Sequence, residues 1–139
     1  MKIHPLLKNV LALVLGLFGG SAINMLIVTI SPHIIPPPAN ADVTTEEGLK
    51  QSIHLFQPIH FLMPFLAHSI GTFVGAYIAA KLASSHKPIF ALIIGIFFLS
   101  GGIYMVTQLP SPLWFNILDL GLAYIPAAWL AVKLAVNKN

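Results

Sequence analysis

The chain has 139 residues, of which 57% are hydrophobic and only 8% are charged, and its formal net charge is +3 at pH 7. Soluble domains carry about a quarter charged residues, so this composition excludes a water-soluble fold and indicates one membrane domain over residues 1–139. The lysines lie beside apolar segments rather than in one patch, which argues against nucleic-acid binding. The absence of cysteine excludes thiol–disulfide exchange and Cys-ligated metal centres.

The first apolar segment, residues 9–31, is an uncharged run of 23 residues, which is long enough to cross a bilayer. A cleaved signal peptide is the rival interpretation, because Lys2 and Lys8 precede the run and Gly20-Ser21-Ala22 resembles a cleavage site. The apolar run continues to Ile30, beyond the usual hydrophobic core of a signal peptide. We therefore expect a retained transmembrane helix.

Residues 32–57 form the only long connection between apolar segments, and Pro36-Pro37-Pro38 predicts a stiff, extended turn within it. Thr44 and Glu47 then have the spacing of a capping box at a helix start. Beyond them, apolar and polar side chains fall on opposite sides of a helix, and the apolar side comprises Leu49, Ile53 and Phe56. We expect a short amphipathic helix that lies on the membrane surface or covers the bundle.

The second apolar segment, residues 58–81, has two unlike sides when it is wound as a helix. Its bulky side is predicted to face lipid and comprises Leu62, Met63, Leu66, Ile70, Phe73 and Tyr77. Its small and polar side comprises His60, Pro64, Ala67, His68, Gly71, Thr72, Gly75 and Ala79. Small residues let another helix approach closely and buried polar residues need partners, so we expect the other segments to pack against this second side.

Glycines at four-residue spacing predict where the first two segments pack. Gly16, Gly20 and Asn24 recur every four residues in the first segment, and Gly71 and Gly75 form a G-x-x-x-G motif in the second. Such a motif packs helices within a bundle or between subunits. We expect the first seam to lie against the second segment.

Two further crossings complete the predicted fold, at residues 88–108 and 113–132. Ser100-Gly101-Gly102 interrupts the third segment near mid-depth and permits close contact or a bend. Trp114 and Trp129 lie near opposite ends of the fourth segment, as interfacial anchors do. The predicted fold class is an all-α integral membrane bundle of four antiparallel transmembrane helices with a short extracytoplasmic amphipathic helix.

The lysines predict the orientation of the bundle. With four crossings, six of the seven fall on one side, namely Lys2, Lys8, Lys81, Lys87, Lys133 and Lys138. Positive residues stay in the cytoplasm. The sequence therefore predicts a multi-pass inner (plasma) membrane protein with both termini cytoplasmic and residues 32–57 outside.

Asp119 is the most informative polar residue. At 1.5 Å per residue it lies about 9 Å below the outer end of its helix, where an ionised carboxylate costs on the order of 2.5–3.5 kcal/mol. It should face the bundle interior, on the same side as Asn116. We expect His68 within hydrogen-bond or one-water distance of Asp119. Both should lie below residues 32–57, which we call the outer segment. The structural alternative is an anchor that only fixes the register of the helices.

The histidines do not predict a metal site. His60 lies near the interface, and eight residues along one helix separate it from His68 by about 12 Å, whereas metal–nitrogen bonds are about 2.1 Å. No two-ligand motif such as HExxH is present. The sequence therefore predicts no metal and no cofactor.

Several short sequence segments are distinctive as a group: PPPAN, HLFQP, AHSIGTFVGAYIAA, LPSPLWFNILDL and AYIPAAW. In these the chain resembles an uncharacterised family of small bacterial integral membrane proteins with four spans. The resemblance covers residues 30–133. It implies the four-span architecture and assigns no functional residue.

The leading functional hypothesis is a non-enzymatic binding or accessory protein with an outward-facing polar cavity for a lipid-like ligand or a partner's helix. The predicted ligand or proton site comprises Asp119, His68, Asn24, Asn116 and His60. The alternative is a small oligomeric proton- or cation-coupled transporter in which Asp119 and His68 exchange protons. An enzyme using this pair as acid and base is disfavoured, because no nucleophile is visible. The expected partners are membrane lipids, with a homo-oligomer or a larger membrane complex left open.

Overall fold

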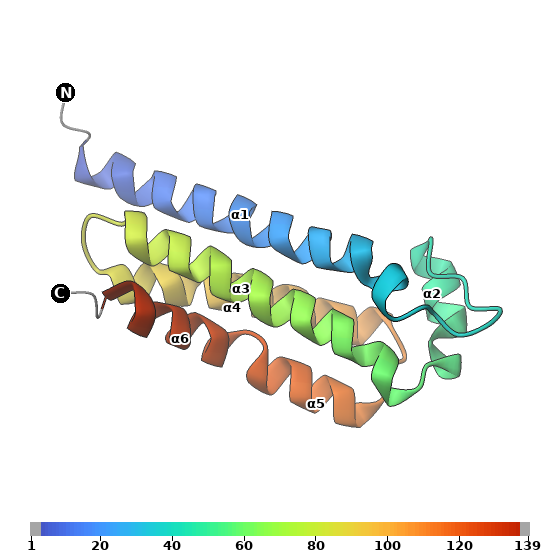
Figure 1. Ribbon diagram of the computed structural model, residues 1–139. Helices are drawn as coiled ribbons and strands as arrows, with labels where there is room; N and C mark the ends of the chain where they lie inside the picture. Colours follow the sequence, from blue (N-terminus) through green and yellow to red (C-terminus); the bar gives the residue numbers. More distant parts are fainter. Residues whose placement is uncertain (1–3, 137–139) are drawn as a thin grey trace.

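The computed structural model describes residues 4–136, so the predicted lysines Lys2 and Lys138 lie outside the described residues. Within that range every regular element is helical (Figure 1), and the elements are α1 (Pro5–Ile34), α2 (Glu46–Ser52), η1 (Ile53–Leu55), η2 (Pro58–Phe61), α3 (Leu62–Leu82), α4 (Lys87–Gln108), α5 (Leu113–Leu122) and α6 (Ile125–Val136). The two η elements are short 3-10 helices. Four helical spans are long and apolar enough to cross a membrane, namely Pro5–Ile34, Pro58–Leu82, Lys87–Gln108 and Leu113–Val136. The predicted helical membrane bundle is confirmed.

Helix α3 occupies the centre of the bundle. It packs against α1 on one side and against α4 and α6 on the other, whereas α1 touches α4 only sparsely. Most residues that α3 buries are small, as expected for close helix packing: Ala67, Gly71, Thr72, Gly75, Ala76, Ala79 and Ala80. The predicted lipid-facing position of Met63 is wrong, since only 6% of it is exposed. Met63 precedes Ala67 by four residues and therefore lies on the same side of the helix.

The close contact between α1 and α3 depends on glycines. A Cβ atom added at Gly16 would lie 2.7 Å from the carbonyl oxygen of Gly75, and one added at Gly20 would lie 2.7 Å from that of Gly71. One turn further out, a Cβ at Gly71 would lie 2.9 Å from the Cβ of Asn24. The two backbones therefore touch along this line, which we call the α1–α3 seam.

The two ends of the bundle differ in charge and packing. Both described chain ends and the α3–α4 turn lie at one end of the molecule, and α2 lies at the other (Figure 1). The first end carries Lys8, Lys81, Lys87 and Lys133. The core near this end is built from α3, α4 and α6 and consists mainly of alanine: Ala76, Ala79, Ala80, Ala91, Ile94, Ala128, Ala131 and Ala135. We call the end that carries these four lysines the inner end and the end that carries α2 the outer end.

The fourth span differs from the continuous helix that was predicted. It divides into α5 and α6, with a turn at Ala123 and Tyr124 between them. Pro126 explains the break, because its nitrogen has no hydrogen to donate to the carbonyl four residues earlier, at Leu122. Helix α4, in contrast, continues through Ser100-Gly101-Gly102 without a break.

The outer segment contains the predicted short helix with a different cap. The N-cap of α2 is Thr45, whose side-chain oxygen accepts a hydrogen bond from the Gly48 amide at 2.9 Å. The predicted capping box at Thr44 and Glu47 is therefore wrong by one residue. Thr44 instead donates its backbone amide and its hydroxyl to Asp42, at 2.9 and 2.6 Å. These bonds take Thr44 out of the capping position, because the Asp42 carboxylate fixes the turn that precedes α2.

Candidate functional site

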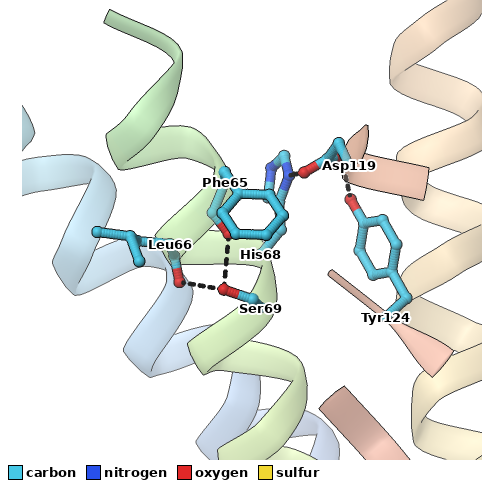
Figure 2. A network of polar contacts seen from close by, with 6 residues as sticks. All are labelled: Phe65, Leu66, His68, Ser69, Asp119 and Tyr124. Atoms are coloured by element: carbon cyan, nitrogen blue, oxygen red, sulfur yellow. Dashed lines mark hydrogen bonds and ion pairs between the residues drawn. The ribbon is translucent and has the colours of Figure 1, made fainter. Parts of the chain in front are cut away.

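Three polar side chains meet inside the outer half of the bundle. The Nδ1 atom of His68 lies 2.9 Å from Oδ1 and 3.0 Å from Oδ2 of Asp119. The hydroxyl of Tyr124 donates a hydrogen bond to Oδ2 of the same carboxylate at 3.0 Å. Figure 2 shows the His68 ring and the Tyr124 hydroxyl pointing toward Asp119 from different elements. We call these three residues the polar triad.

The break in the fourth span creates the contact between Tyr124 and Asp119. In an uninterrupted helix, two residues five apart point about 140° away from each other around the axis. The turn at Ala123 and Tyr124 changes this direction and returns the tyrosine hydroxyl to the carboxylate. Gly102 of α4 leaves room for the ring, because a Cβ at that position would lie 2.5 Å from the Tyr124 hydroxyl oxygen. The Tyr124 ring also stacks on His68, with ring centroids 5.8 Å apart.

The hydrogen bonds of the polar triad compensate the burial of its carboxylate. Asp119 is only 4% exposed, and a buried charge needs both a partner and hydrogen bonds. When Asp119 is ionised it can only accept, so Nδ1 of His68 carries the hydrogen of that bond. The other ring nitrogen, Nε2, makes no bond within the polar triad and can therefore bind a ligand.

A cavity of about 250 Å³ lies between the polar triad and the outer segment. We call it the outer cavity. Leu49 and Ile53 of the outer segment line one side of it, and Phe115 and Val106 line the helical side. Its polar lining consists of His68, Ser111, Asn116 and Asp119. The cavity is therefore mostly apolar, with the polar groups gathered on its wall, as in binding sites for small molecules.

The other predicted site residues are distributed differently. Asn116 lines the outer cavity and donates a hydrogen bond to the carbonyl of Ser111 at 3.4 Å. Asn24 lies with His68 on the wall of a second cavity, between α1 and α4. His60 does not join the polar triad, because its Nδ1 accepts the backbone amide of Gln57 at 2.9 Å and caps η2.

Tyr124, Gly102 and Thr72 were not assigned to the site by the sequence. The presence of Pro126 inside a predicted span is the signal that could have pointed to Tyr124, because a helix break redirects its neighbours. Within residues 4–136, no three side chains of the histidine, aspartate and glutamate type come together as a metal site would require. No protein-family model, curated protein sequence or solved structure matches the chain.

Proposed function

We propose that the protein binds a small amphipathic molecule in the outer cavity, as a membrane-embedded binding or accessory protein. The observation that carries this proposal is a buried carboxylate on the wall of a mostly apolar cavity beneath the outer segment. A residue that only fixed helix register would have no need of such a cavity beside it. The polar head of the ligand would lie at Asp119 and His68, and its apolar part would contact Phe115 and Ile53.

The volume and chemistry of the outer cavity limit the ligand. About 250 Å³ is slightly below the range of about 300–1,000 Å³ typical of drug-sized ligands, so the bound molecule or bound headgroup is small. Asp119 accepts hydrogen bonds from His68 and Tyr124 and retains acceptor capacity on its two oxygens. These properties favour a head that donates hydrogen bonds, such as a hydroxyl or an ammonium group.

The proposed location is the inner (plasma) membrane, with both termini in the cytoplasm and the outer cavity on the extracytoplasmic side. The four described lysines at the inner end support this orientation, because positive residues are retained in the cytoplasm. Glu46 and Glu47 lie in α2 at the opposite end. Membrane lipids surround the protein, and self-association or a larger membrane complex remains compatible with the exposed apolar helices.

Native mass spectrometry of the protein released from membranes tests the binding proposal. The wild-type protein should retain a bound small molecule, and Asp119→Asn should lose it while remaining folded by thermal unfolding. Glu46→Gln is the matched control, because it also converts a carboxylate into an amide, at an exposed position outside the cavity. Equal retention by the wild type and Asp119→Asn, or no bound molecule in either, would contradict the proposal.

A second function, a proton- or cation-coupled transporter acting as an oligomer, is favoured by one observation. The fourth span is broken next to Asp119, and discontinuous helices commonly form the ion and substrate sites of secondary transporters. The alanine-rich core near the inner end offers no polar relay within the described residues. Transport would therefore require a pathway shared between subunits. Flux driven by a pH gradient in proteoliposomes, abolished by Asp119→Asn, would establish this function over simple binding.

A further inference from the structure

A second cavity of about 280 Å³ opens on the side of the bundle between α1 and α4. We call it the lateral cavity. It exists because α1 packs on α3 along the α1–α3 seam and touches α4 only sparsely. Its lining includes Asn24 of α1 and, at the rim, the exposed residues Gly101 and Tyr104 of α4. Since these helices lie in membrane spans, the rim faces lipid rather than water.

The floor of the lateral cavity contains an unsatisfied hydroxyl group. Thr72 is 1% exposed, and its Oγ1 has no hydrogen-bond partner among residues 4–136. A buried hydroxyl without a partner is unfavourable, because it has lost its hydrogen bonds to water. At about 15 Å below the outer end of α3, Thr72 lies near the middle of the hydrocarbon layer. A molecule in the cavity that reaches Oγ1 would supply the missing hydrogen bond.

The remaining polar groups of the lateral cavity define the chemistry of that molecule. Asn24 contributes an amide that can both donate and accept, and His68 lines this cavity as well as the outer one. No lysine lines the lateral cavity, so a phosphate group would find no opposite charge there. Asp119 lines only the outer cavity. Tyr104 and Tyr124 also line the lateral cavity, and the Tyr124 hydroxyl already donates to Asp119. The lateral cavity therefore offers hydroxyl, amide and imidazole groups, and no carboxylate or ammonium group lines it.

We infer that the lateral cavity is a second binding site, which accepts from the bilayer the neutral hydroxyl or carbonyl head of a lipid-soluble molecule. Thr72 and Asn24 bind the head, and the apolar part of the molecule extends between α1 and α4 into the lipid. This site is distinct from the binding site proposed in the outer cavity, because its occupant enters from the lipid at the side of the bundle and does not contact Asp119. The two sites share three lining residues, His68, Gly102 and Met105.

Two variants change the lateral cavity at a single side chain each. Thr72→Val keeps the shape of the side chain and removes the hydroxyl. Gly101→Leu places a bulky side chain at the rim, where an added Cβ meets nothing within 4 Å. Gly121→Leu is its matched control, because an added Cβ at Gly121 also meets nothing within 4 Å and this glycine lines neither the lateral nor the outer cavity.

The test is photolabelling of the full chain in phosphatidylcholine vesicles with two probes that carry the same diazirine-bearing acyl chain. One probe is a diacylglycerol, with a neutral hydroxyl head, and the other is a phosphatidylglycerol. We expect the diacylglycerol to label α4 around Phe98 and Tyr104, which line the lateral cavity and not the outer one, more strongly than the phosphatidylglycerol does. Both probes should label the lipid-facing side of α1 at Phe18 equally. Thr72→Val should weaken the α4 labelling about three- to tenfold, as expected for one lost hydrogen bond.

Gly101→Leu should reduce the α4 labelling to the level of the phosphatidylglycerol probe, and Gly121→Leu should leave it unchanged. Thermal unfolding of each variant checks that it is folded. Equal labelling of α4 by the two probes, or labelling that neither Thr72→Val nor Gly101→Leu reduces, would overturn the inference and leave ordinary lipid contact or bound water as the occupant. Because Asp119 takes no part in this test, the outcome is independent of the outer cavity.

Discussion

A carboxylate at the position of Asp119 would be unfavourable by several kcal/mol without partners, because water cannot solvate it there. The polar triad offsets this penalty with hydrogen bonds from a histidine of α3 and from a tyrosine in the turn after α5. Removing Asp119 leaves both His68 and Tyr124 without this partner, and removing His68 leaves the carboxylate with Tyr124 alone. His68 and Asp119 are therefore expected to act as an energetic unit rather than as independent residues.

A double-mutant cycle measures this coupling. His68→Leu and Asp119→Leu should each destabilise the protein by about 1–3 kcal/mol, because each leaves a buried polar group without its partner. The double variant should be less destabilised than the sum of the two, by a coupling free energy of about 0.5–3 kcal/mol. Denaturant unfolding in micelles provides the measurement, with Ser69→Leu as a control, since Ser69 bonds only to carbonyls of its own helix. Strictly additive effects would contradict a direct pair.

Among the elements, α1 depends on the α1–α3 seam. Of its 30 residues, only Ala12, Gly16 and Gly20 are buried, so nearly all of its attachment to the bundle runs along one line. Backbone contact of this kind leaves no room for a methyl group, because the added carbon would overlap a carbonyl oxygen of α3. A single substitution of a glycine in the α1–α3 seam should therefore weaken the packing of the whole of α1 against α3.

Gly16→Ala is the corresponding prediction. We expect a loss of about 1–3 kcal/mol of stability from overpacking, since the added Cβ would lie 2.7 Å from the Gly75 carbonyl oxygen. Gly101→Ala is the control and should be neutral or stabilising by up to about 1 kcal/mol, because alanine favours the helix and the site is open. Thermal unfolding midpoints of the two variants give the comparison. A similar midpoint for both would show that α1 docks without this close approach.

The start of α2 depends on Asp42, whose carboxylate accepts two hydrogen bonds from Thr44. The side-chain and backbone bonds from Thr44 hold the pKa of Asp42 below its ordinary value of 3.8. Because the folded pKa is the lower one, the stabilisation of this turn is fully present above the ordinary value. It is lost only as the pH falls through the folded value.

Nuclear magnetic resonance of the labelled protein in micelles tests this prediction. The Thr44 amide should shift as Asp42 is protonated, with a midpoint below pH 3.8, and should remain unchanged between pH 7 and 5. Asp42→Asn should abolish the titration while the resonances of the helical spans stay in place. A midpoint at or above 3.8 would mean that the Thr44 bonds do not hold the carboxylate in solution.

At the scale of the whole molecule, the core near the inner end is packed with alanines, whereas the outer and lateral cavities lie between mid-depth and the outer end. Alanine side chains let α3, α4 and α6 approach closely near the inner end. Toward the outer end, the break between α5 and α6 and the larger side chains leave space that the outer segment covers. Any ligand would therefore approach from the outer side or through the bilayer.

Cysteine labelling tests the proposed orientation, and the natural chain gives no background because it contains no cysteine. Ala39→Cys lies in the exposed outer segment, and Ser85→Cys lies in the exposed turn between α3 and α4. A membrane-impermeant maleimide should label Ala39→Cys in intact bacterial cells, and should label Ser85→Cys only after permeabilisation. The reverse pattern would place the outer cavity on the cytoplasmic side.

The sequence by itself determined the spans, the central role of α3 and the burial of Asp119 beside His68. These features follow from residue type and helical period, because apolar length, small-residue spacing and the depth of a charge are local properties. Only the tertiary structure placed Tyr124 on Asp119, His60 at the start of η2 and Thr72 beneath the lateral cavity. The physical reason differs between them. Tyr124 and His60 contact residues five and three positions away, but at a helix break and a 3-10 turn, where regular helical period no longer gives the direction of a side chain. Thr72 lies beneath a cavity that exists because α1 and α4, which are distant in the chain, stay apart.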